Sequence, residues 1–507
     1  MSVPLFQLYN DFCRIRKRVR HFGLRCRGMN PLVAAAALAI THVTVIDVER
    51  GARLADRTVL IQDGKIASVD AAPPQGVPVL DGTGKFVIPG LWDMHAHPNY
   101  AGGRDEDADR NGRRVFLPLY LANGVTGLRI MAGDCDAPAG APCEGKNRFD
   151  GLKAWQREIA AGTLPGPARM VIATVWVDGP HPHWAGSISV KSPAEARAVV
   201  RRAKERGFDL IKVYNGLSPE SFHALAGEAR KLGMPIGGHV PRLVSAAEAS
   251  EAGMVSEEHL FGLQEGCAKD TAALYAARRK VADDRKALSA LMNQQRASLP
   301  YDGPGCKALF ETFRRNGTFI VPTYSFLRSD SSASYADPPR RQDDPALRYV
   351  PADVRKQWQE FLDKNAPQVT PQDLVTDRAV FHEQLAVARR LSDAGVGLLA
   401  GSDGDNPFVI PGFSLQDELR LMVEGGLTPL QALQTATLNP ARYLRQVDRF
   451  GTVAPGRAAD LLVLDADPLE RIENTARIHA VIAGGRLYRR ADLDALLLRA
   501  EESMGTP

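Results

Sequence analysis

Two histidines separated by a single residue, His95 and His97, lie in a short apolar stretch of this chain. Side chains two positions apart on a β-strand point to the same face, so both imidazoles would reach one pocket. Imidazole is a good ligand for zinc and similar divalent ions. The pair alone is weak evidence, and a metal site needs further ligands from other parts of the chain.

Four more polar side chains stand at the ends of other apolar runs: Lys212, His239, His259 and Asp403. Burial disfavours the ammonium form of a lysine, and a neutral amine can add carbon dioxide to form a carbamate that bridges two cations. Taken singly, Lys212 could instead pair with an acid at the rim, and the others could be hydrogen-bonded caps or core groups. Together with the His-x-His pair they predict a metal-dependent site.

The runs that carry these residues alternate with helical segments along the middle of the chain. The eight runs cover residues 86–94, 124–131, 168–177, 208–214, 234–239, 254–260, 318–324 and 396–400. Eight strands alternating with helices predict an α/β fold, a TIM-like (β/α)8 barrel whose chemistry lies at the C-terminal ends of the strands. An open doubly wound sheet is the alternative, but the first run is not followed by a glycine-rich phosphate loop.

Both ends of the chain are β-rich, which predicts a small β-sandwich built from residues 41–88 and 446–490. The barrel would then occupy residues 89–445. Two of its spacers, 262–316 and 327–394, exceed what a crossover needs, and we expect them to be helical insertions over the barrel mouth. Residues 491–507 are expected to form a C-terminal tail.

The composition is that of an ordinary globular protein, since 44% of the 507 residues are hydrophobic and 24% are charged. The net charge of +4 comes largely from a basic stretch before residue 28, so the remainder gives no argument for a nucleic-acid partner. Residues 1–40 combine this stretch with a short apolar run and resemble a secretory signal, or else form a disordered basic leader. The expected location is periplasmic or secreted, otherwise cytoplasmic. No transmembrane segment is expected, and a homo-oligomer is possible.

The six cysteines contain no Cys-x-x-Cys pair, so a thiolate zinc site is not expected. Cys135 and Cys143 flank a small loop and could form one disulfide, and Cys267 and Cys306 could form a larger one. Free thiols are the alternative. Paired loop cysteines would favour an oxidising compartment.

From about residue 41 to 490 the sequence resembles the amidohydrolase superfamily, in its binuclear branch with a carboxylated lysine. The similarity is greatest to imidazolonepropionase-like and Xaa-Pro dipeptidase-like members. The motifs that carry it are Val-Ile-Pro-Gly-Leu-Trp-Asp-Met-His-Ala-His at 87–97, Gly-Val-Thr-Gly-Leu-Arg at 124–129, Ile-Lys-Val-Tyr at 211–214, Gly-His at 238–239, Glu-His at 258–259, Ser-Asp at 402–403, and the segments 427–441 and 451–461.

This resemblance implies two divalent metal ions, with zinc as the expected metal. One ion would be bound by His95, His97 and Asp403, and the other by His239 and His259. Carboxylated Lys212 would bridge them. Hydroxide activated by the ions would attack the substrate, and Asp403 would act as the general base.

The substrate-contact residues are predicted from position. Tyr214 follows Lys212 by two residues, so it should face inward and donate to a developing oxyanion, unless it only packs in the barrel. His181 and His183 follow the third run and could contact the substrate or be exposed. Arg242 follows the fifth run and could pair with a substrate carboxylate or lie on the surface. Arg129 lies within a run, where an inward-facing ion pair is expected.

These features predict an amidohydrolase that cleaves the amide or peptide C–N bond of a small substrate, such as a dipeptide or an N-acyl amino acid. An esterase, lactonase or phosphotriesterase that uses the same binuclear site is the first alternative. A mononuclear deaminase is the second, although it would not need Lys212. A binding protein on an inactive barrel is disfavoured because every expected ligand type is present.

Overall fold

The computed structural model describes residues 37–98, 108–132, 149–184, 186–330, 344–404 and 406–504. All of them belong to one compact unit, residues 35–507, which is distinct from residues 1–34. Most of the expected leader and the pair Cys135 and Cys143 therefore lie outside the described residues. Residues 37–40 were expected to end the leader, but they begin a strand, because they pair with residues 59–62 of the next strand and Leu38–Ile40 are buried.

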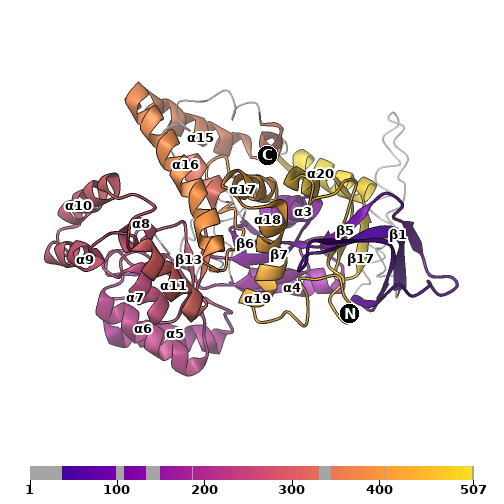
Figure 1. Ribbon diagram of the computed structural model, residues 1–507, viewed down its shortest axis with the longest axis horizontal. Coiled ribbons are helices and arrows are strands. Elements are labelled where there is room, and N and C mark those ends of the chain that lie inside the picture. Colours follow the sequence, from indigo (N-terminus) through magenta and orange to yellow (C-terminus); the bar gives the residue numbers. More distant parts are fainter. Residues whose placement is uncertain are drawn as a thin grey trace, which may run out of the picture. The chain divides into compact units, whose positions relative to one another are not determined.

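Strands from both ends of the chain share one eight-stranded sheet, in the order β17-β16-β15-β5-β1-β2-β3 with β4 beside β1 (Figure 1, indigo and yellow). These strands are β1 (Ala37–Asp47), β2 (Ala52–Gln62), β3 (Lys65–Val69), β4 (Val79–Asp81), β5 (Phe86–Pro89), β15 (Leu461–Leu464), β16 (Ile478–Ala483) and β17 (Arg486–Arg489). The two ends meet where β5 pairs antiparallel with β15. The described strands form one hydrogen-bonded sheet, because the long β1 pairs along its length with β2, β4 and β5. The two-layered sandwich expected from the sequence stays a prediction.

The middle of the chain supplies two further sets of parallel strands. One set is β6 (Leu91–Ala96), β7 (Val125–Ile130) and β8 (Arg169–Ile172). The other is β9 (Val177–Asp178), β10 (Ile188–Ser189), β11 (Ile211–Val213), β12 (Ile236–Gly238), β13 (Met254–Glu258) and β14 (Phe319–Val321). Except for β10, these strands overlap the apolar runs identified in the sequence. Most of them are buried on both faces, as is typical of parallel strands.

Backbone contacts continue the sequence of strands beyond these two sets. A parallel bridge joins Ala173, after β8, to Leu210, before β11, and another joins Ile320 of β14 to Leu398. The backbone N–H of Met94 in β6 donates to the carbonyl of Ala400 at 2.8 Å. The eighth apolar run is therefore bonded to both the seventh and the first. Residues that follow these segments are consequently brought toward a common edge.

Helices connect the strands, and local capping residues fix their ends. They are α2 (Ala108–Asn111), α3 (Leu117–Ala122), α4 (Phe149–Ala161), α5 (Pro193–Arg206), α6 (Pro219–Leu232), α7 (Ala246–Glu251), α8 (Leu263–Gly266), α9 (Thr271–Lys280), α10 (Arg285–Ser298), α11 (Cys306–Asn316), α12 (Tyr324–Asp330), α15 (Ala352–Asn365), α16 (Pro371–Asp393), α17 (Phe413–Glu424), α18 (Pro429–Thr435), α19 (Leu438–Tyr443) and α20 (Arg490–Met504). Ser218, for example, caps α6 with its side chain, and a left-handed Gly233 ends that helix.

The described residues of both long spacers are largely helical, as predicted. The first contains α8 to α11, which lie together in Figure 1, and a disulfide joins Cys267 after α8 to Cys306 at the start of α11. This confirms one of the two cysteine pairs considered from the sequence. The second contains α15 and α16. The segment expected as a tail includes α20, which packs against α3.

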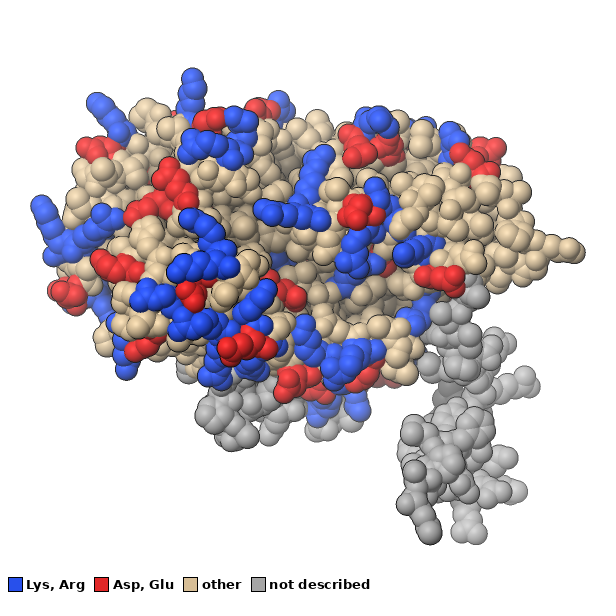
Figure 2. All heavy atoms as spheres, turned by 90° about the horizontal axis from the view of Figure 1, so that it is seen from below, with Lys and Arg blue, Asp and Glu red and all other residues tan. Residues whose placement is uncertain are grey.

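Charged side chains of both signs are interspersed on the face shown in Figure 2. Among the described residues as a whole many charged side chains are paired, for example Arg389 with Asp393 at 2.7 Å on α16. Such a mixture produces no large field of one sign, so this face gives no support for nucleic-acid binding. Among the described residues, no helix is both long enough and apolar enough to cross a bilayer.

Glu418 on α17 provides a prediction about stability. It is fully buried, its Oε2 accepts the backbone N–H of Ser325 at 2.8 Å, and burial raises its pKa to about 8 from 4.5. Between pH 4.5 and 8 the Glu418 carboxyl is therefore protonated in the folded state but ionised in the unfolded state. The free energy of unfolding consequently decreases as pH rises through this window. The shift corresponds to roughly 5 kcal/mol at about 1.4 kcal/mol per pKa unit.

Glu418→Gln removes the ionisation but keeps the size of the side chain. We expect thermal unfolding at pH 5 and pH 8.5 to show a smaller loss of melting temperature in the variant than in the unmodified protein. Asp93 is also buried with a raised pKa, of about 6, but both proteins contain it, so the difference between them isolates Glu418. Equal losses would show that Glu418 does not carry this pH dependence.

Candidate metal centre

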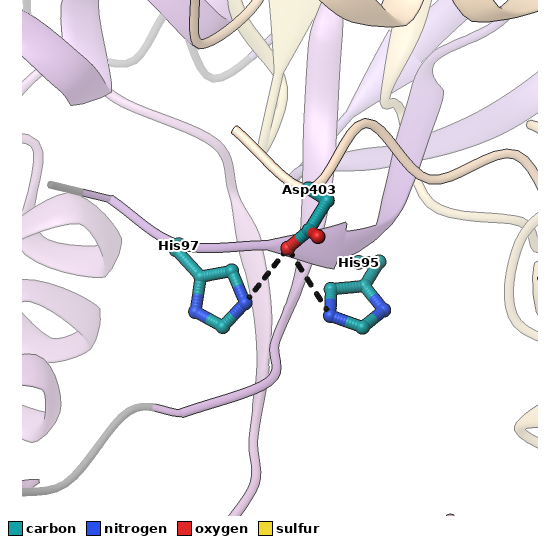
Figure 3. Close-up of side chains that lie close together, drawn as sticks. All are labelled: His95, His97 and Asp403. Carbon is teal, nitrogen blue, oxygen red and sulfur yellow. Dashed lines mark ion pairs between the residues drawn. The ribbon is translucent and has the colours of Figure 1, made fainter. Parts of the chain in front are cut away.

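The imidazoles of His95 and His97 meet the carboxylate of Asp403 at the end of β6 (Figure 3). Oδ1 of Asp403 lies 3.4 Å from Nε2 of His95 and 3.1 Å from Nε2 of His97. One possible ligand atom from each residue lies within 4.8 Å of the others, and all three residues are buried. Ligand atoms around a tetrahedral ion bonded at about 2.1 Å are about 3.4 Å apart, so this trio fits a single divalent ion.

Asp93 connects the two chain segments that carry this trio. Its Oδ1 accepts the backbone N–H of His95 at 3.2 Å and that of Ser402 at 3.0 Å, and its Oδ2 accepts the Ser402 hydroxyl at 2.5 Å. The N–H of Asp403 in turn donates to the carbonyl of His95 at 2.8 Å. The relative position of His95 and Asp403 is thus fixed by backbone contacts rather than by their side chains alone.

Lys212, His239 and His259 lie beside the trio. Nζ of Lys212 on β11 is 3.3 Å from Nε2 of His95, and Nδ1 of His259 is 3.7 Å from Oδ2 of Asp403. The His259 ring lies 4.6 Å from that of His95 and 4.7 Å from that of His239, between centroids. The structure therefore brings all six residues selected from the sequence into one buried cluster.

The histidines share an orientation that leaves Nε2 for a ligand. Nδ1 of His95, His239 and His259 lies 2.8 Å, 3.0 Å and 2.7 Å from side-chain oxygens of Glu258, Asn215 and Thr323, respectively. A carboxylate or amide oxygen accepts the Nδ1 hydrogen, which places the lone pair on Nε2. Nδ1 of His97 is buried and has no partner among the described residues.

Electrostatics also suit a cation. Burial lowers the pKa of both His95 and His239 well below 6.5, with the charge of Lys212 as the next cause, so these imidazoles are neutral. Burial raises the pKa of Asp403, but His259, His97 and Lys212 more than offset this and bring it to about 2. Neutral imidazoles around an ionised carboxylate are the forms in which these side chains bind metal.

Four of the ten described non-glycine residues with a positive φ lie at this cluster. His259 and Asp403 have φ values of +62° and +59°, and Leu260 and Thr323 have +58° and +51°. Residues other than glycine rarely adopt this left-handed region, and they retain it where surrounding contacts require it. Two of the six candidate ligands are therefore held in uncommon conformations at the ends of their segments.

Arg129 and Glu258 are functional candidates behind His95. The guanidinium of Arg129 donates from Nη2 to both oxygens of Glu258 at 2.8 and 2.9 Å, and Ser256 donates to the same carboxylate at 2.7 Å. This confirms the inward-facing ion pair expected for Arg129. Glu258 was quoted as part of a motif but was not selected as a site residue. The sequence feature that could have identified Glu258 is its position directly before the candidate ligand His259, at the end of a strand.

The residues expected to contact substrate lie at different distances from the cluster. The Tyr214 ring packs 4.3 Å from that of His239, and its oxygen accepts the Trp184 indole N–H at 2.9 Å. The His183 ring is 6.4 Å from the Tyr214 ring. His181 is exposed and makes no side-chain contact with the other described residues. Arg242 is half-buried after β12 and lines a cavity with Asn215.

The role of Glu258 in positioning can be tested through metal affinity. Glu258→Gln replaces one acceptor oxygen with an N–H2 group that faces the Arg129 donors, so the bond that orients His95 is disturbed. We expect about 10- to 100-fold weaker binding of Zn2+, the usual cost of losing such a partner. The measurement is competition with a chromogenic chelator, with circular dichroism to verify folding.

Glu257→Gln is the matched control, because Glu257 is the neighbouring buried acid and burial raises its pKa well above 4.5. Glu258→Asp keeps the negative charge beside Arg129 but has a side chain too short to reach His95. This variant replaces Glu258→Gln in the metal-affinity measurement if the glutamine variant does not fold. Unchanged affinity in both Glu258 variants, or an equal loss in Glu257→Gln, would contradict the positioning role.

Comparisons with known proteins show which proteins this chain resembles. Residues 349–488 match the model described as Amidohydrolase family. An ochratoxinase from Aspergillus niger is 23% identical over an alignment that covers 96% of this chain and 94% of its own. The solved structure of a bottromycin amidohydrolase superimposes with a TM-score of 0.69 and 25% identity over 95% of each chain.

A crystal structure of a Xaa-Pro dipeptidase with bound methionine has a TM-score of 0.60 and 19% identity, and the match covers 89% of this chain and all of the other. At that identity the likeness concerns the fold, which is α/β and similar to a TIM barrel. The resemblance recognised from the motifs is confirmed: the chain contains an amidohydrolase family domain.

Proposed function

We propose that this protein is a metal-dependent amidohydrolase that cleaves the amide or peptide C–N bond of a small substrate, such as a dipeptide or an N-acyl amino acid. The observation that carries the proposal is the meeting of four histidines, a lysine and an aspartate in one buried cluster. The names of the relatives, ochratoxinase, bottromycin amidohydrolase and Xaa-Pro dipeptidase, point to the same class of reaction.

The proposed architecture is a complete (β/α)8 barrel over residues 89–445, with a β-domain formed by the strands of both termini. The parallel bridges at Ala173 and Ile320 and the hydrogen bond from Met94 to Ala400 support closure of the barrel. A closed barrel explains why ligands from β6, β11, β12 and β13 can meet, since the ends of all strands then surround one opening.

Two divalent ions, with zinc as the expected metal, fit the donor set. His95, His97 and Asp403 would hold one, His239 and His259 the other, and a carbamate on Lys212 would bridge them. When bound, such ions supply Lewis acidity and make a water molecule acidic enough to act as a nucleophile near neutral pH. The position of Lys212 supports the carbamate, because its side chain is buried and its Nζ lies 3.3 Å from Nε2 of His95, among the other candidate ligands.

Asp403 is the proposed general base. It is ionised, its carboxylate faces the imidazoles, and its oxygens are held by contacts from two directions. A carboxylate is a weak base, so it accepts a proton readily only from a water molecule that is unusually acidic. The same carboxyl group would then deliver the proton to the leaving nitrogen.

Tyr214 is the proposed donor to the oxyanion. The Trp184 indole N–H donates to the phenol oxygen at 2.9 Å and the Tyr214 ring packs against His239, so the position of the phenol group is fixed. Such a fixed donor stabilises negative charge that develops on a carbonyl oxygen. His183, packed edge-on against Trp184, is the better placed of the two loop histidines for substrate contact. Both histidines are exposed, and His181 is the weaker candidate because its ring makes no comparable contact with the other described residues.

Export to the periplasm or the exterior is proposed for the compartment. The disulfide between Cys267 and Cys306 supports an oxidising environment, because such bonds are rare in reducing cytosol. The cytoplasmic alternative predicts free thiols at these two positions.

A substrate panel tests the proposed reaction. We expect the zinc-loaded protein to hydrolyse N-acyl amino acids or dipeptides, and Asp403→Asn to lower kcat by about a thousandfold or more without loss of folding. Asp417→Asn, on the exposed face of α17, is the matched control and should keep full activity. Turnover of aryl esters alone would favour the esterase, lactonase or phosphotriesterase reading instead.

Metal stoichiometry tests the binuclear site. Lys212→Ala removes the amine that would carry the bridging carbamate, so we expect two equivalents of bound metal to fall to one or none, as measured by elemental analysis after dialysis. One equivalent in both proteins would instead support the mononuclear deaminase alternative.

A further inference from the structure

A cavity of about 150 Å3 lies between the loops that follow β11, β12 and β13 and the helices α8 to α10. Asn215 and Arg242 line it from the loops. Tyr275, Met292 and Arg296 line it from the helices. Its volume suits a group of a few heavy atoms rather than a whole peptide.

The cavity shares a wall with the candidate metal centre. Asn215, which lines it, accepts the Nδ1 hydrogen of His239 at 3.0 Å. Phe261, another lining residue, has its ring 5.1 Å from that of His239 and 5.2 Å from that of His259. Asn215 and Phe261 therefore border both the candidate metal centre and this space.

Three arginines line the cavity against a single carboxylate, that of Glu265. Glu265 and Arg278 are both buried and form an ion pair at 2.6 Å, so they neutralise each other. Arg278 also donates to Gln295 at 2.7 Å and is fully committed to the protein. Arg296 lies farther from the Glu265 carboxylate, at 3.5 Å, and its guanidinium stands over the Phe261 ring at 5.7 Å.

Arg242 is half-buried, and its guanidinium makes no hydrogen bond or ion pair with any residue that the structure describes. The nearby carboxylate of Asp178 is already used by the backbone N–H groups of Gly179, His183 and Gly216. Burial lowers the pKa of Arg242, which means that its charge is incompletely solvated. A half-buried cation in this state favours an anionic ligand.

We propose that this cavity binds the carboxylate of the substrate on the leaving-group side of the scissile bond, with Arg242 as its principal partner and Arg296 as the second. The inference rests on the proposed amide hydrolysis and specifies which part of the substrate is recognised. A guanidinium binds a carboxylate through two parallel N–H bonds, which gives both affinity and orientation. Phe261 and Met292 supply an apolar wall for the adjoining side chain.

The inserted helices therefore act as the specificity element. They contribute Arg296 from α10, and Arg278 from α9 donates to the backbone carbonyl of Arg242 at 3.3 Å. The disulfide between Cys267 and Cys306 joins the two ends of this insertion. The barrel strands carry the candidate ligands, and the insertion determines which substrates reach them.

Two substrates that differ only in the carboxylate test the proposal: N-acetyl-leucine and its decarboxylated counterpart N-isopentylacetamide. With the zinc-loaded protein we expect Arg242→Met to lower kcat/KM for N-acetyl-leucine by about 100-fold, the usual scale for losing one partner of a desolvated charge pair. Activity on N-isopentylacetamide should change by less than about threefold. Arg296→Met should cause a smaller loss, about three- to tenfold, confined to the acid.

Arg279→Met is the matched control, because Arg279 is on α9 but faces Glu248 and does not line the cavity. It should leave both rates unchanged. Equal losses on both substrates in Arg242→Met, or no preference of the unmodified protein for the acid, would overturn the proposal.

Failure of the proposed reaction is distinguished by calorimetry. If neither amide is cleaved, titration of N-acetyl-leucine into the metal-loaded protein still measures the site directly. Binding that weakens at least tenfold in Arg242→Met supports the carboxylate pocket even without hydrolysis. The carboxylate pocket is contradicted if N-acetyl-leucine does not bind the unmodified protein, or if it binds the unmodified protein and Arg242→Met equally well.

Discussion

A carboxylate removed from water requires positive charge or donors beside it, and Asp403 meets this requirement by its position among four imidazoles and an amine. Its side chain is 8% exposed, and contacts from His95, His97 and His259 surround it. These neighbours come from two distant places in the sequence, the end of β6 and the end of β13, so the strands must align before the carboxylate can be buried without a large cost. The cluster therefore constrains the barrel as much as the barrel positions the cluster.

Two further acids determine how His95 presents its ring. Asp93 accepts the backbone N–H of His95, whereas Glu258 accepts its Nδ1 hydrogen, so backbone and side chain are held from separate directions. Arg129 balances the charge of Glu258 in a site where both side chains are fully buried. One histidine thus depends on three residues that need never touch a substrate, and rigid support of this kind keeps a ligand within the small range of geometry that metal binding tolerates.

Much of the centre could be predicted from the sequence, because the types of its ligands and their places at strand ends are local features. His95 and His97 were evident from their spacing, and Lys212 from its position in an apolar run. The network of Glu258, Asn215 and Thr323 could not be derived, because each of them depends on a contact with a histidine from another part of the chain. The cavity beside Arg242 was missed for the same reason. Alternation of strands and helices indicated the α/β fold, but the pairing along β1 and its earlier start depend on long-range partners.

The pairing of β5 with β15 has a consequence for how the chain folds. β5 consists of residues 86–89, and one of its edges pairs with β15, residues 461–464. During synthesis, β15 is made only after the whole segment that carries the candidate ligands. Until then a short strand rich in apolar residues presents unpaired backbone groups, and such edges attract other chains. Fragments that end before residue 461 are for that reason expected to aggregate during expression, even though every candidate metal ligand would be present in them.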